Sequence, residues 1–338
     1  MEASNLPDFI QYLLSSTSYP HRADDVKLVQ THISYVLLAG DYVYKFKKPL
    51  DFGFLNFSTL SKRKYYCTQE ILLNRRLCPT IYLDLVSVNK TDGLLTLNGP
   101  GEPVEYGVKM VRMPEEKMMV NIIRAGNLTQ GMLDDIAVIL ESFYEKAACS
   151  GEIDRFGTPE AVGANVLENL QQSKPHVGCE SLSLEEYNLI ESYGEEFLSQ
   201  KEVFARRIKN GRIRDCHGDL HSRNICLADQ VYIYDCIEFN HRFRYSDVAS
   251  DVAFLAMDLD YHGLDEFSEY FINRFMELSG DSGLTEVLHF YKCYRAAVRG
   301  KIGLLTAHEP EVDEETRAQS LTQATQYFRL AQRYAATG

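Results

Sequence analysis

The chain has 338 residues, of which 45% are hydrophobic and 25% are charged, and its formal net charge is −13. This length allows two domains with their own cores, and the composition is that of a folded protein rather than a disordered one. The acidic balance argues against sequence-independent binding of nucleic acid, which needs a basic surface to displace counterions.

Targeting signals and membrane segments are not expected. Residues 1–14, MEASNLPDFIQYLL, are acidic and are interrupted by Pro7, unlike a secretory signal peptide. No apolar run approaches the roughly 18 residues of a membrane helix. The eight cysteines include no CxxC pair and no zinc-ligand spacing. We therefore expect a cytoplasmic protein with reduced thiols and no membrane partner.

The first part of the chain predicts an antiparallel sheet with one helix. After an N-terminal helix, residues 26–49 alternate β-branched or aromatic residues with polar ones, and a turn at Gly40 divides them into strands. Ser58 is the expected cap of a helix that Pro79 ends. Two further extended segments, IYLDLVSVN and VEYGVKMVRM, are separated by the turn-rich NGPGEP.

From Pro114 onwards the pattern changes to long helical periods. They cover residues 128–148, 160–172, 183–210, 246–259, 263–279, 284–305 and 314–335, with one β-rich interruption at 213–239. The expected boundary lies between Met110 and Pro114. We predict an α+β protein with a small antiparallel-sheet N-lobe, residues 1–113, and a large helical C-lobe, residues 114–338.

The β-rich interruption contains the chemically informative residues. Its segment 215–238 reads DCHGDLHSRNICLADQVYIYDCIE, a polar loop followed by two short apolar strands. Asp219 and Asn224 have the D-x-x-x-x-N spacing of a kinase catalytic loop, and Asp235 follows the second strand. These could be ordinary turn residues, but the agreement of three spacings with the strand context favours a catalytic and metal-binding site.

This segment resembles the aminoglycoside phosphotransferase family, which has a two-lobed protein-kinase-like fold. The family signature H-G-D-x-H-x-x-N, followed by an I-D strand end, matches residues 217–224 and Tyr234-Asp235. The order of elements agrees over nearly the whole chain, while the motifs cover a small part of it. His221 stands where protein kinases have a lysine, which favours a small-molecule substrate over a protein.

The resemblance implies ATP and Mg²⁺ as cofactors. It also implies that the N-lobe binds nucleotide and that the C-lobe holds the catalytic loop, the metal site and the substrate-binding helices. Asp219 would accept the proton of the acceptor hydroxyl or orient its oxygen, and Asn224 and Asp235 would bind Mg²⁺. His217 would be structural, and His221 has no assigned role.

Several charged residues near these motifs have two possible roles. Glu238 is either a second metal contact or a loop residue. Arg242 and Arg244 either contact phosphate or substrate, or pair with Asp247 and Asp251. The resemblance also implies that Asp251 supports the catalytic loop.

On the nucleotide side, Val43-Tyr44-Lys45 resembles the A-x-K of kinases, in which Val43 would pack on adenine and Lys45 would reach the phosphates. Lys47 lies on the same strand face and remains an alternative. Glu70, on the following helix, is the expected partner of Lys45, unless it lies on a solvated face.

No glycine-rich phosphate loop is present, so a P-loop mechanism is excluded. In the resembled family the loop between the first two strands is also poor in glycine, which implies that residues 31–34 cover the phosphates with backbone N–H groups and the Ser34 hydroxyl. Residues 109–114 would form the hinge at the adenine edge. Arg112 and Met113 are therefore candidate nucleotide contacts, although the methionines are equally consistent with a core.

Asp51-Phe52-Gly53 is the tripeptide DFG, whose aspartate binds magnesium in protein kinases. In that fold, however, the metal-binding aspartate follows the catalytic loop. Asp51 precedes Asp219, so its order in the chain excludes this role. Residues 51–57 are instead expected to form a turn and an apolar plug.

Together these features predict ATP-dependent transfer of the γ-phosphoryl group to a hydroxyl of a small polar molecule, such as a sugar or amino sugar. The alternatives are a protein kinase or AMP-transferase on the same fold, and a non-catalytic nucleotide-binding module. Asp219, Asn224 and Asp235 together argue against the last. Members of the resembled group can carry a separate P-loop domain, and none is expected within these residues. The acceptor and the oligomeric state do not follow from the sequence.

Overall fold

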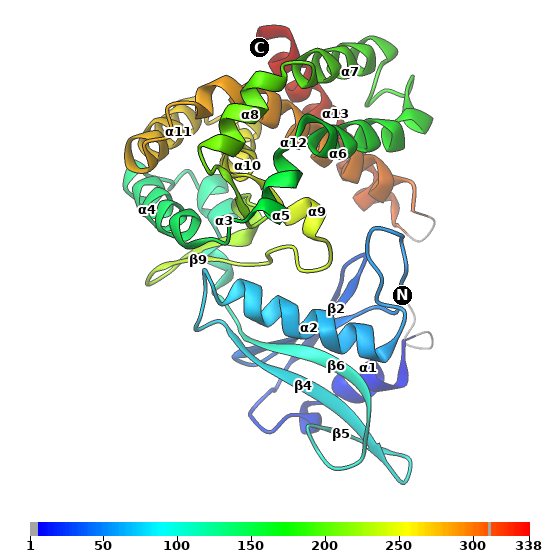
Figure 1. Cartoon of the computed structure of the whole chain (residues 1–338). Coiled ribbons are helices and arrows are strands. Elements are labelled where there is room, and N and C mark those ends of the chain that lie inside the picture. The colour runs from blue at the N-terminus through cyan, green and yellow to red at the C-terminus, as the bar shows by residue number, and fades with distance from the viewer. Residues whose placement is uncertain (1–5, 310–311) are drawn as a thin grey trace. The chain divides into compact units, whose positions relative to one another are not determined.

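The computed structural model describes residues 6–309 and 312–338. The chain forms two compact units, one made of the residues up to Met118 together with Ala228–His241, and the other of Met119–Leu227 together with Arg242–Gly338. An antiparallel sheet is followed along the chain by a mostly helical region, as Figure 1 shows, which confirms the predicted α+β class.

The first unit is built on a six-stranded sheet in the order β1-β2-β3-β6-β4-β5, in which every neighbouring pair is antiparallel. Its elements are α1 (Asp8–Leu13), η2 (Ser16–Ser18), β1 (Val26–Gln30), β2 (Ser34–Ala39), β3 (Tyr42–Lys47), α2 (Leu60–Asn74), β4 (Tyr82–Thr91), β5 (Leu94–Leu97), β6 (Glu102–Val111), η3 (Glu115–Lys117) and β9 (Val231–Ile233).

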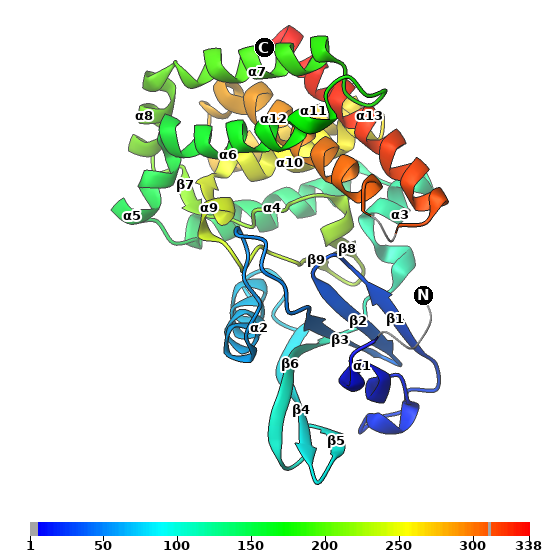
Figure 2. The same ribbon diagram turned by 90° about the vertical axis from the view of Figure 1, so that its right-hand side faces the viewer.

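Strand β3 shows how the sheet separates an apolar face from a charged one. Tyr44 and Phe46 point to a buried cluster that includes Ile10 and Leu13 of α1. Because side chains alternate along a strand, Lys45 and Lys47 point to the other face, where α2 packs. Helices α1 and α2 thus cover opposite faces of the sheet (Figure 2).

Two local features of this unit follow from single residues. Gly40, in the β2–β3 turn, has φ of +60°, and a Cβ there would lie 2.4 Å from the carbonyl oxygen of Arg22, so only glycine fits without strain. The cap of α2 is Thr59, whose side chain accepts from the N–H of Lys62. The prediction of Ser58 was wrong by one residue, because the Ser58 hydroxyl donates to Asn56 instead.

The second unit is mostly helical. It contains α3 (Met119–Arg124), α4 (Gln130–Lys146), α5 (Gly151–Asp154), η4 (Arg155–Gly157), α6 (Pro159–Ser173), η5 (Lys174–His176), α7 (Leu184–Leu198), α8 (Lys201–Lys209), β7 (Ile213–Asp215), η6 (Ser222–Asn224), β8 (Ile225–Leu227), β10 (Tyr245–Asp247), α10 (Val248–Tyr261), α11 (Asp265–Ser279), α12 (Leu284–Ala307) and α13 (Glu314–Thr337), while α9 (His241–Arg244) begins at its edge. The helix predicted over residues 183–210 is two helices, α7 and α8, because Gln200 leaves the helical conformation.

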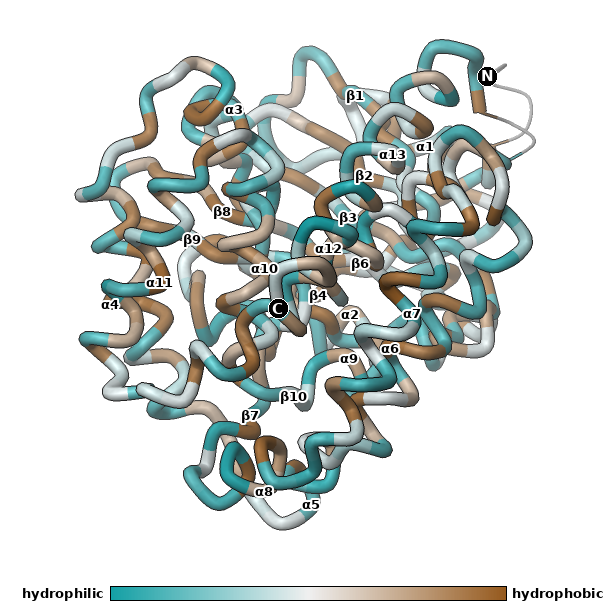
Figure 3. The backbone as a smooth tube through the Cα atoms, turned by 90° about the horizontal axis from the view of Figure 1, so that it is seen from above, coloured by the Kyte–Doolittle hydropathy of each residue, from teal (hydrophilic) through white to brown (hydrophobic). Residues whose placement is uncertain are grey.

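Helix α10 forms the centre of this unit. Every residue from Val248 to Asp260 is buried, and the helix packs against α11 and α12. A helix that is buried on all sides belongs to the core of a large unit. The outer helices α4 and α11 lie side by side and carry hydrophobic stretches among hydrophilic ones in Figure 3, as amphipathic helices do. α10 therefore gives a rigid support to any loop bonded to it.

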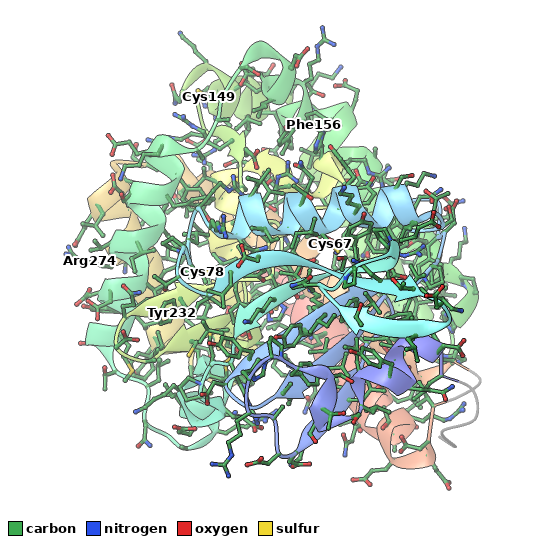
Figure 4. The ribbon with its side chains drawn as sticks, turned by 90° about the horizontal axis from the view of Figure 1, so that it is seen from below. Cys67, Cys78, Cys149, Phe156, Tyr232 and Arg274 are labelled. Carbon is green, nitrogen blue, oxygen red and sulfur yellow. The ribbon has the colours of Figure 1, made fainter. Side chains whose placement is uncertain are left out.

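The cysteines form no disulfides among the described residues: all eight are free, and six are buried. Figure 4 labels Cys67 and Cys78, which are buried, and Cys149, which is exposed. Within the same described ranges, no helix combines the length and apolar character that a membrane span requires.

Candidate active site

The loop that contains Asp219 is fixed by a buried carboxylate of α10. Asp251, which has no exposed surface, accepts from the backbone N–H of His217 at 2.6 Å and of Gly218 at 2.9 Å. It also accepts from the Tyr144 hydroxyl at 3.1 Å. Gly218 has φ of +90°, a conformation that other residues rarely adopt. Asp251 therefore occupies the supporting position that the sequence predicted for it.

A second helix holds the same loop through Arg295 of α12. Its Nη1 donates to the carbonyl oxygen of Gly218 at 3.1 Å, and its Nε donates to Ser250 Oγ at 3.2 Å. Its Nη2 lies 3.7 Å from Asp251 Oδ1. Sequence reasoning missed Arg295 and Tyr144, because neither belongs to a motif and both reach the loop only through tertiary packing.

Asp219 and Asn224 contact each other directly. Asn224 Nδ2 donates to the Asp219 carbonyl oxygen at 2.9 Å and to Asp219 Oδ2 at 3.0 Å. The amide nitrogen is thereby occupied, which leaves the side-chain oxygen of this buried asparagine to accept from other groups. The Asp219 side chain is 34% exposed. The five-residue spacing thus brings the two side chains together.

His221, which had no assigned role, is a neighbour of Asp219. Its Nδ1 accepts from the N–H of Arg223 at 3.3 Å, and its Nε2 lies 3.4 Å from Asp219 Oδ2. A neutral imidazole that accepts at Nδ1 carries its proton on Nε2. His221 therefore presents an N–H to the Asp219 carboxylate.

The surroundings of Asp219 keep it ionised. Burial raises the pKa of Asp219, but the attraction and the hydrogen bond of His221, helped by Arg299 and His217, outweigh burial and lower the pKa below its ordinary value. A carboxylate with a low pKa is a weak base. It is better suited to orient a hydroxyl than to remove its proton early.

In the first unit, Lys45 lies between two carboxylates. Its Nζ is 2.9 Å from Glu70 Oε1 and 2.6 Å from Asp235 Oδ1. Lys45 is 17% exposed and Asp235 43%, whereas Glu70 is almost fully buried. Glu70 is therefore the inner partner expected for Lys45, whereas Lys45 and Asp235 are both partly exposed.

Lys47, the alternative to Lys45, is enclosed. Its Nζ lies 2.6 Å from Glu70 Oε2, bonds Glu238 Oε1, and stands 4.8 Å from the centre of the Phe57 ring. Its side chain is 1% exposed, so of the two lysines Lys45 is the one that can face a ligand. Glu238 is turned toward Lys47, which favours a structural role over a second metal contact.

Asp235 has an unusual backbone. Its φ is +62°, in the left-handed region, although it is not glycine. Its N–H donates to the Tyr82 hydroxyl at 3.2 Å, and the next N–H, of Cys236, donates to Asn74 Oδ1 at 2.9 Å. Such conformations persist only where the surroundings hold them, and they gather at functional sites. No sequence pattern predicted the left-handed conformation of Asp235.

The position of Ser34 does not favour the role expected for it. Ser34 is fully buried at the start of β2, opposite Lys47 in the strand pairing. Directly opposed residues share a face, so the burial of Lys47 also encloses Ser34. The N–H groups of Ser34 and Ile33 donate to Thr31 Oγ1 at 3.0 and 3.4 Å, so the loop N–H groups expected to cover phosphates are used within the loop.

The remaining nucleotide candidates lie on or just after β3 and β6. Val43 is half-buried and is paired with Leu38 and Met110. Arg112 is exposed, and its N–H donates to the carbonyl oxygen of Asp41 at 2.8 Å. Met113 is half-buried beyond the end of β6.

For Arg242 and Arg244, the sequence left open a contact with phosphate or substrate, or pairing with Asp247 and Asp251. Arg244 and Arg242 do pair with acids, but with Asp215 and Glu168 rather than with Asp247 and Asp251.

Asp51 forms a turn, in which its Oδ1 accepts from the N–H of Gly53 at 3.0 Å. Leu55 and Phe57 are the buried part of the expected plug, while Phe52 and Phe54 are exposed.

Asp251→Asn should lower the free energy of unfolding of the second unit by about 1–3 kcal/mol. The carboxylate accepts one backbone N–H with each of its oxygens, whereas the amide has a single acceptor oxygen and an NH₂ group that cannot accept. Chemical denaturation followed by circular dichroism measures this change. Asp135→Asn, at an exposed position of α4, is the control and should have little effect. Equal stability of the two variants would show that Asp251 does not fix the loop.

Glu70 predicts a specific acid sensitivity. Burial raises the pKa of Glu70, but the opposing effect of Lys45 and Lys47 is larger. The pKa therefore falls from its ordinary value of 4.5 to about 2. A lowered folded-state pKa stabilises the fold above the ordinary value, and this contribution disappears as the pH falls from 4.5 toward 2. In denaturation series, the stability difference between wild type and Glu70→Gln should therefore shrink over this range. A constant difference would contradict the assignment.

Comparison with known proteins starts from sequence. No protein-family model matches the chain. Curated relatives from Mycobacterium bovis and Mycobacterium tuberculosis, both described as uncharacterized proteins, are 37% identical over 275 residues, which is 81% of this chain and 53% of each relative. The chain therefore spans about half the length of the curated relatives it matches.

Solved structures are similar over nearly the whole chain. An aminoglycoside phosphotransferase in complex with GDP and kanamycin has a TM-score of 0.58 at 13% identity, covering 94% of this chain and 98% of its own. An amicoumacin kinase with AMP-PNP and Ca²⁺ has 0.56 at 10% identity, covering 96% and 94%. A choline/ethanolamine kinase family protein of Mesorhizobium loti has 0.51 at 11% identity, covering 93% and 92%. The chain thus has the protein-kinase-like fold of the aminoglycoside phosphotransferases and choline/ethanolamine kinases.

Proposed function

We propose that this chain is an ATP- and Mg²⁺-dependent phosphotransferase, which moves the γ-phosphoryl group of ATP to a hydroxyl of a small polar molecule. The observation that carries the proposal is the Asp219 carboxylate, bonded to Asn224 on a loop whose backbone is held by the buried Asp251. The similarity in fold to small-molecule kinases supports it. Phosphoryl transfer depends mainly on positioning and on neutralising charge, which this arrangement can supply.

Asp219 is the proposed catalytic residue. Its Oδ2 is engaged by Asn224 and approached by His221, which leaves Oδ1 to accept a hydrogen bond from the acceptor hydroxyl. Holding that oxygen in line for attack removes much of the entropic part of the barrier. The low pKa of Asp219 favours this orienting role, with the proton transferred late.

Asn224 and Asp235 are the proposed Mg²⁺ ligands. Mg²⁺ prefers oxygen ligands and is commonly held by one or two protein side chains together with substrate phosphates. The amide oxygen of Asn224, whose amide nitrogen is bonded to Asp219, and the part-exposed carboxylate of Asp235 fit this preference. When bound, the ion would neutralise charge on the phosphate oxygens.

Lys45, held from behind by Glu70, is the proposed contact of the α- and β-phosphates. Val43 is proposed to cover the adenine and the backbone of Met113 to meet its edge. Arg112 is a less favoured nucleotide contact, because its backbone N–H already donates to the carbonyl oxygen of Asp41.

Lys45→Ala should raise the Michaelis constant for ATP by about tenfold to a hundredfold, the usual value of a hydrogen bond to a charged group. Titration with a fluorescent ATP analogue and Mg²⁺ measures the same loss as binding. Lys90→Ala, at an exposed position of β4, is a suitable control. An unchanged Michaelis constant and rate would exclude Lys45 as the phosphate contact and leave Lys47.

A screen of a metabolite library with ATP and Mg²⁺ tests the function itself. We expect one class of hydroxyl compound to gain a mass of about 80, the mass of an added phosphoryl group. A gain that corresponds to AMP would instead indicate an AMP-transferase. Binding of ATP with no product from any acceptor, and no slow hydrolysis of ATP, would indicate a binding module.

A further inference from the structure

The charged cluster of the first unit contains one lysine and one glutamate more than the proposed phosphate contact requires. Glu70 divides its two oxygens, with Oε1 2.9 Å from Lys45 Nζ and Oε2 2.6 Å from Lys47 Nζ. Asp235 also bonds Lys45, but Glu70 is the carboxylate that the two lysines share, and it cannot balance both ammonium groups alone. A buried charge without a partner is costly. Lys47 is fully buried and therefore needs a counterion of its own.

Glu238 supplies that counterion. Its Oε1 bonds Lys47 Nζ, and the two side chains are only 6% and 1% exposed. Lys47 Nζ also lies over the face of the Phe57 ring, 4.8 Å from its centre, where a cation is favoured. Because Glu238 balances Lys47, Glu70 keeps Oε1 for Lys45.

The same bond ties the segment that holds Asp235 to the sheet. Glu238 follows Asp235 by three residues, and Lys47 is the last residue of β3. Tyr82 and Asn74 accept from the backbone N–H groups of Asp235 and Cys236. The left-handed residue Asp235 is thus fixed by two backbone hydrogen bonds and by the ion pair of Glu238, three residues later.

We propose that Lys47 and Glu238 are a positioning pair of the nucleotide site. The pair holds Glu70 and the Asp235 segment in place, so that Lys45 and Asp235 are aligned for the phosphates and the metal ion. Neither member touches the ligand. This inference depends on the proposed function, since it concerns the nucleotide site of that reaction.

The sign of one mutational effect separates positioning from simple electrostatics. Glu238→Gln removes a negative charge near the anionic nucleotide, which by long-range attraction alone would strengthen binding. If Glu238 positions the site, Lys47 instead competes with Lys45 for Glu70, and binding weakens. We expect the dissociation constant for ATP with Mg²⁺ to rise by about tenfold or more.

The double variant Lys47→Met with Glu238→Gln gives the cleanest comparison. It keeps the net charge of the wild type and leaves no unpaired charge from the deleted pair, so it should fold with nearly wild-type stability. We expect ATP to bind about tenfold more weakly, while adenosine, which lacks phosphates, binds as in the wild type. Wild-type affinity for ATP in the folded double variant would overturn the proposal, as would equal losses for ATP and adenosine.

A buried ion pair elsewhere in the unit provides the matched control. Arg63 Nε lies 2.7 Å from Glu105 Oε1, with side chains 9% and 4% exposed. Glu105→Gln should lower stability but leave the affinity for ATP unchanged; an equal loss of affinity would make the effect of Glu238 a general consequence of destabilisation. Failure of the wild type to bind ATP would refute the proposed function instead, so the two failures are distinguishable.

Discussion

Replacing Asp219 with alanine should slow phosphoryl transfer by about 10²- to 10⁴-fold, the usual contribution of a positioned acid or base. The reason is local: Asp219 is the only carboxylate of residues 217–224, and its Oδ1 is left available by the bonds of Oδ2. Rates at saturating ATP, measured with the acceptor that the screen identifies, give the comparison.

The same variant should retain its fold and its affinity for nucleotide, because the loop backbone is held by Asp251 and not by the Asp219 side chain. Asp135→Ala, at an exposed acid of α4, serves as the control for handling and charge. Turnover of Asp219→Ala at the rate of this control would remove Asp219 from the mechanism.

Arg207→Met should lower the free energy of unfolding by about 3–5 kcal/mol, as expected when one partner of a buried ion pair is removed. Arg207 is 3% exposed and joins three elements of the second unit. Its Nε lies 2.7 Å from Oδ2 of Asp247, the N-cap of α10, and its Nη1 lies 2.5 Å from Oδ1 of Asp281, just before α12. The substitution leaves Asp247 buried without this cation, while Asp281 keeps the more distant Arg212, whose Nε lies 3.6 Å from its Oδ1.

The neighbouring Arg206 offers a control on the same helix. It pairs with Glu286, but the two side chains are 54% and 48% exposed. An exposed pair contributes about 0–1 kcal/mol, so Arg206→Met should have little effect. Denaturant titration of both variants decides the matter, and losses of similar size would mean that the buried network does not stabilise this unit.

The parts of the site that are close in sequence were predictable. Asp219 and Asn224 are separated by one tight loop, so their spacing alone implies that the side chains can meet. Long helices were also predictable, because their apolar positions recur with the helical period. The break between α7 and α8 was not, since residues 199 and 200 are ordinary polar residues in a continuous helical pattern.

The parts that depend on distant residues were not predictable. A strand places Lys45 and Lys47 on one face, so the sequence alone could not choose between them. The choice comes from Glu238 and Phe57, which enclose Lys47 and leave Lys45 part-exposed. The burial of Ser34 was not predictable for the same reason, because it follows from the strand partner of Ser34, Lys47.

Charged partners show this limit again. Arg244 was expected to pair with one of two acids that follow it closely in the chain, yet it pairs with Asp215, the residue it meets through the pairing of β7 and β10. Arg295 reaches Gly218 from a helix far along the chain. No local pattern encodes such contacts.

The fate of isotopically labelled ATP is the most direct test of the central claim. The chain is incubated with Mg²⁺, a pool of small hydroxyl compounds, and ATP labelled in either the γ- or the α-phosphate. We predict that the γ-label appears in a small-molecule product and that the α-label remains in ADP. Transfer of the α-label, or transfer of neither label by a chain that binds ATP, would contradict the account.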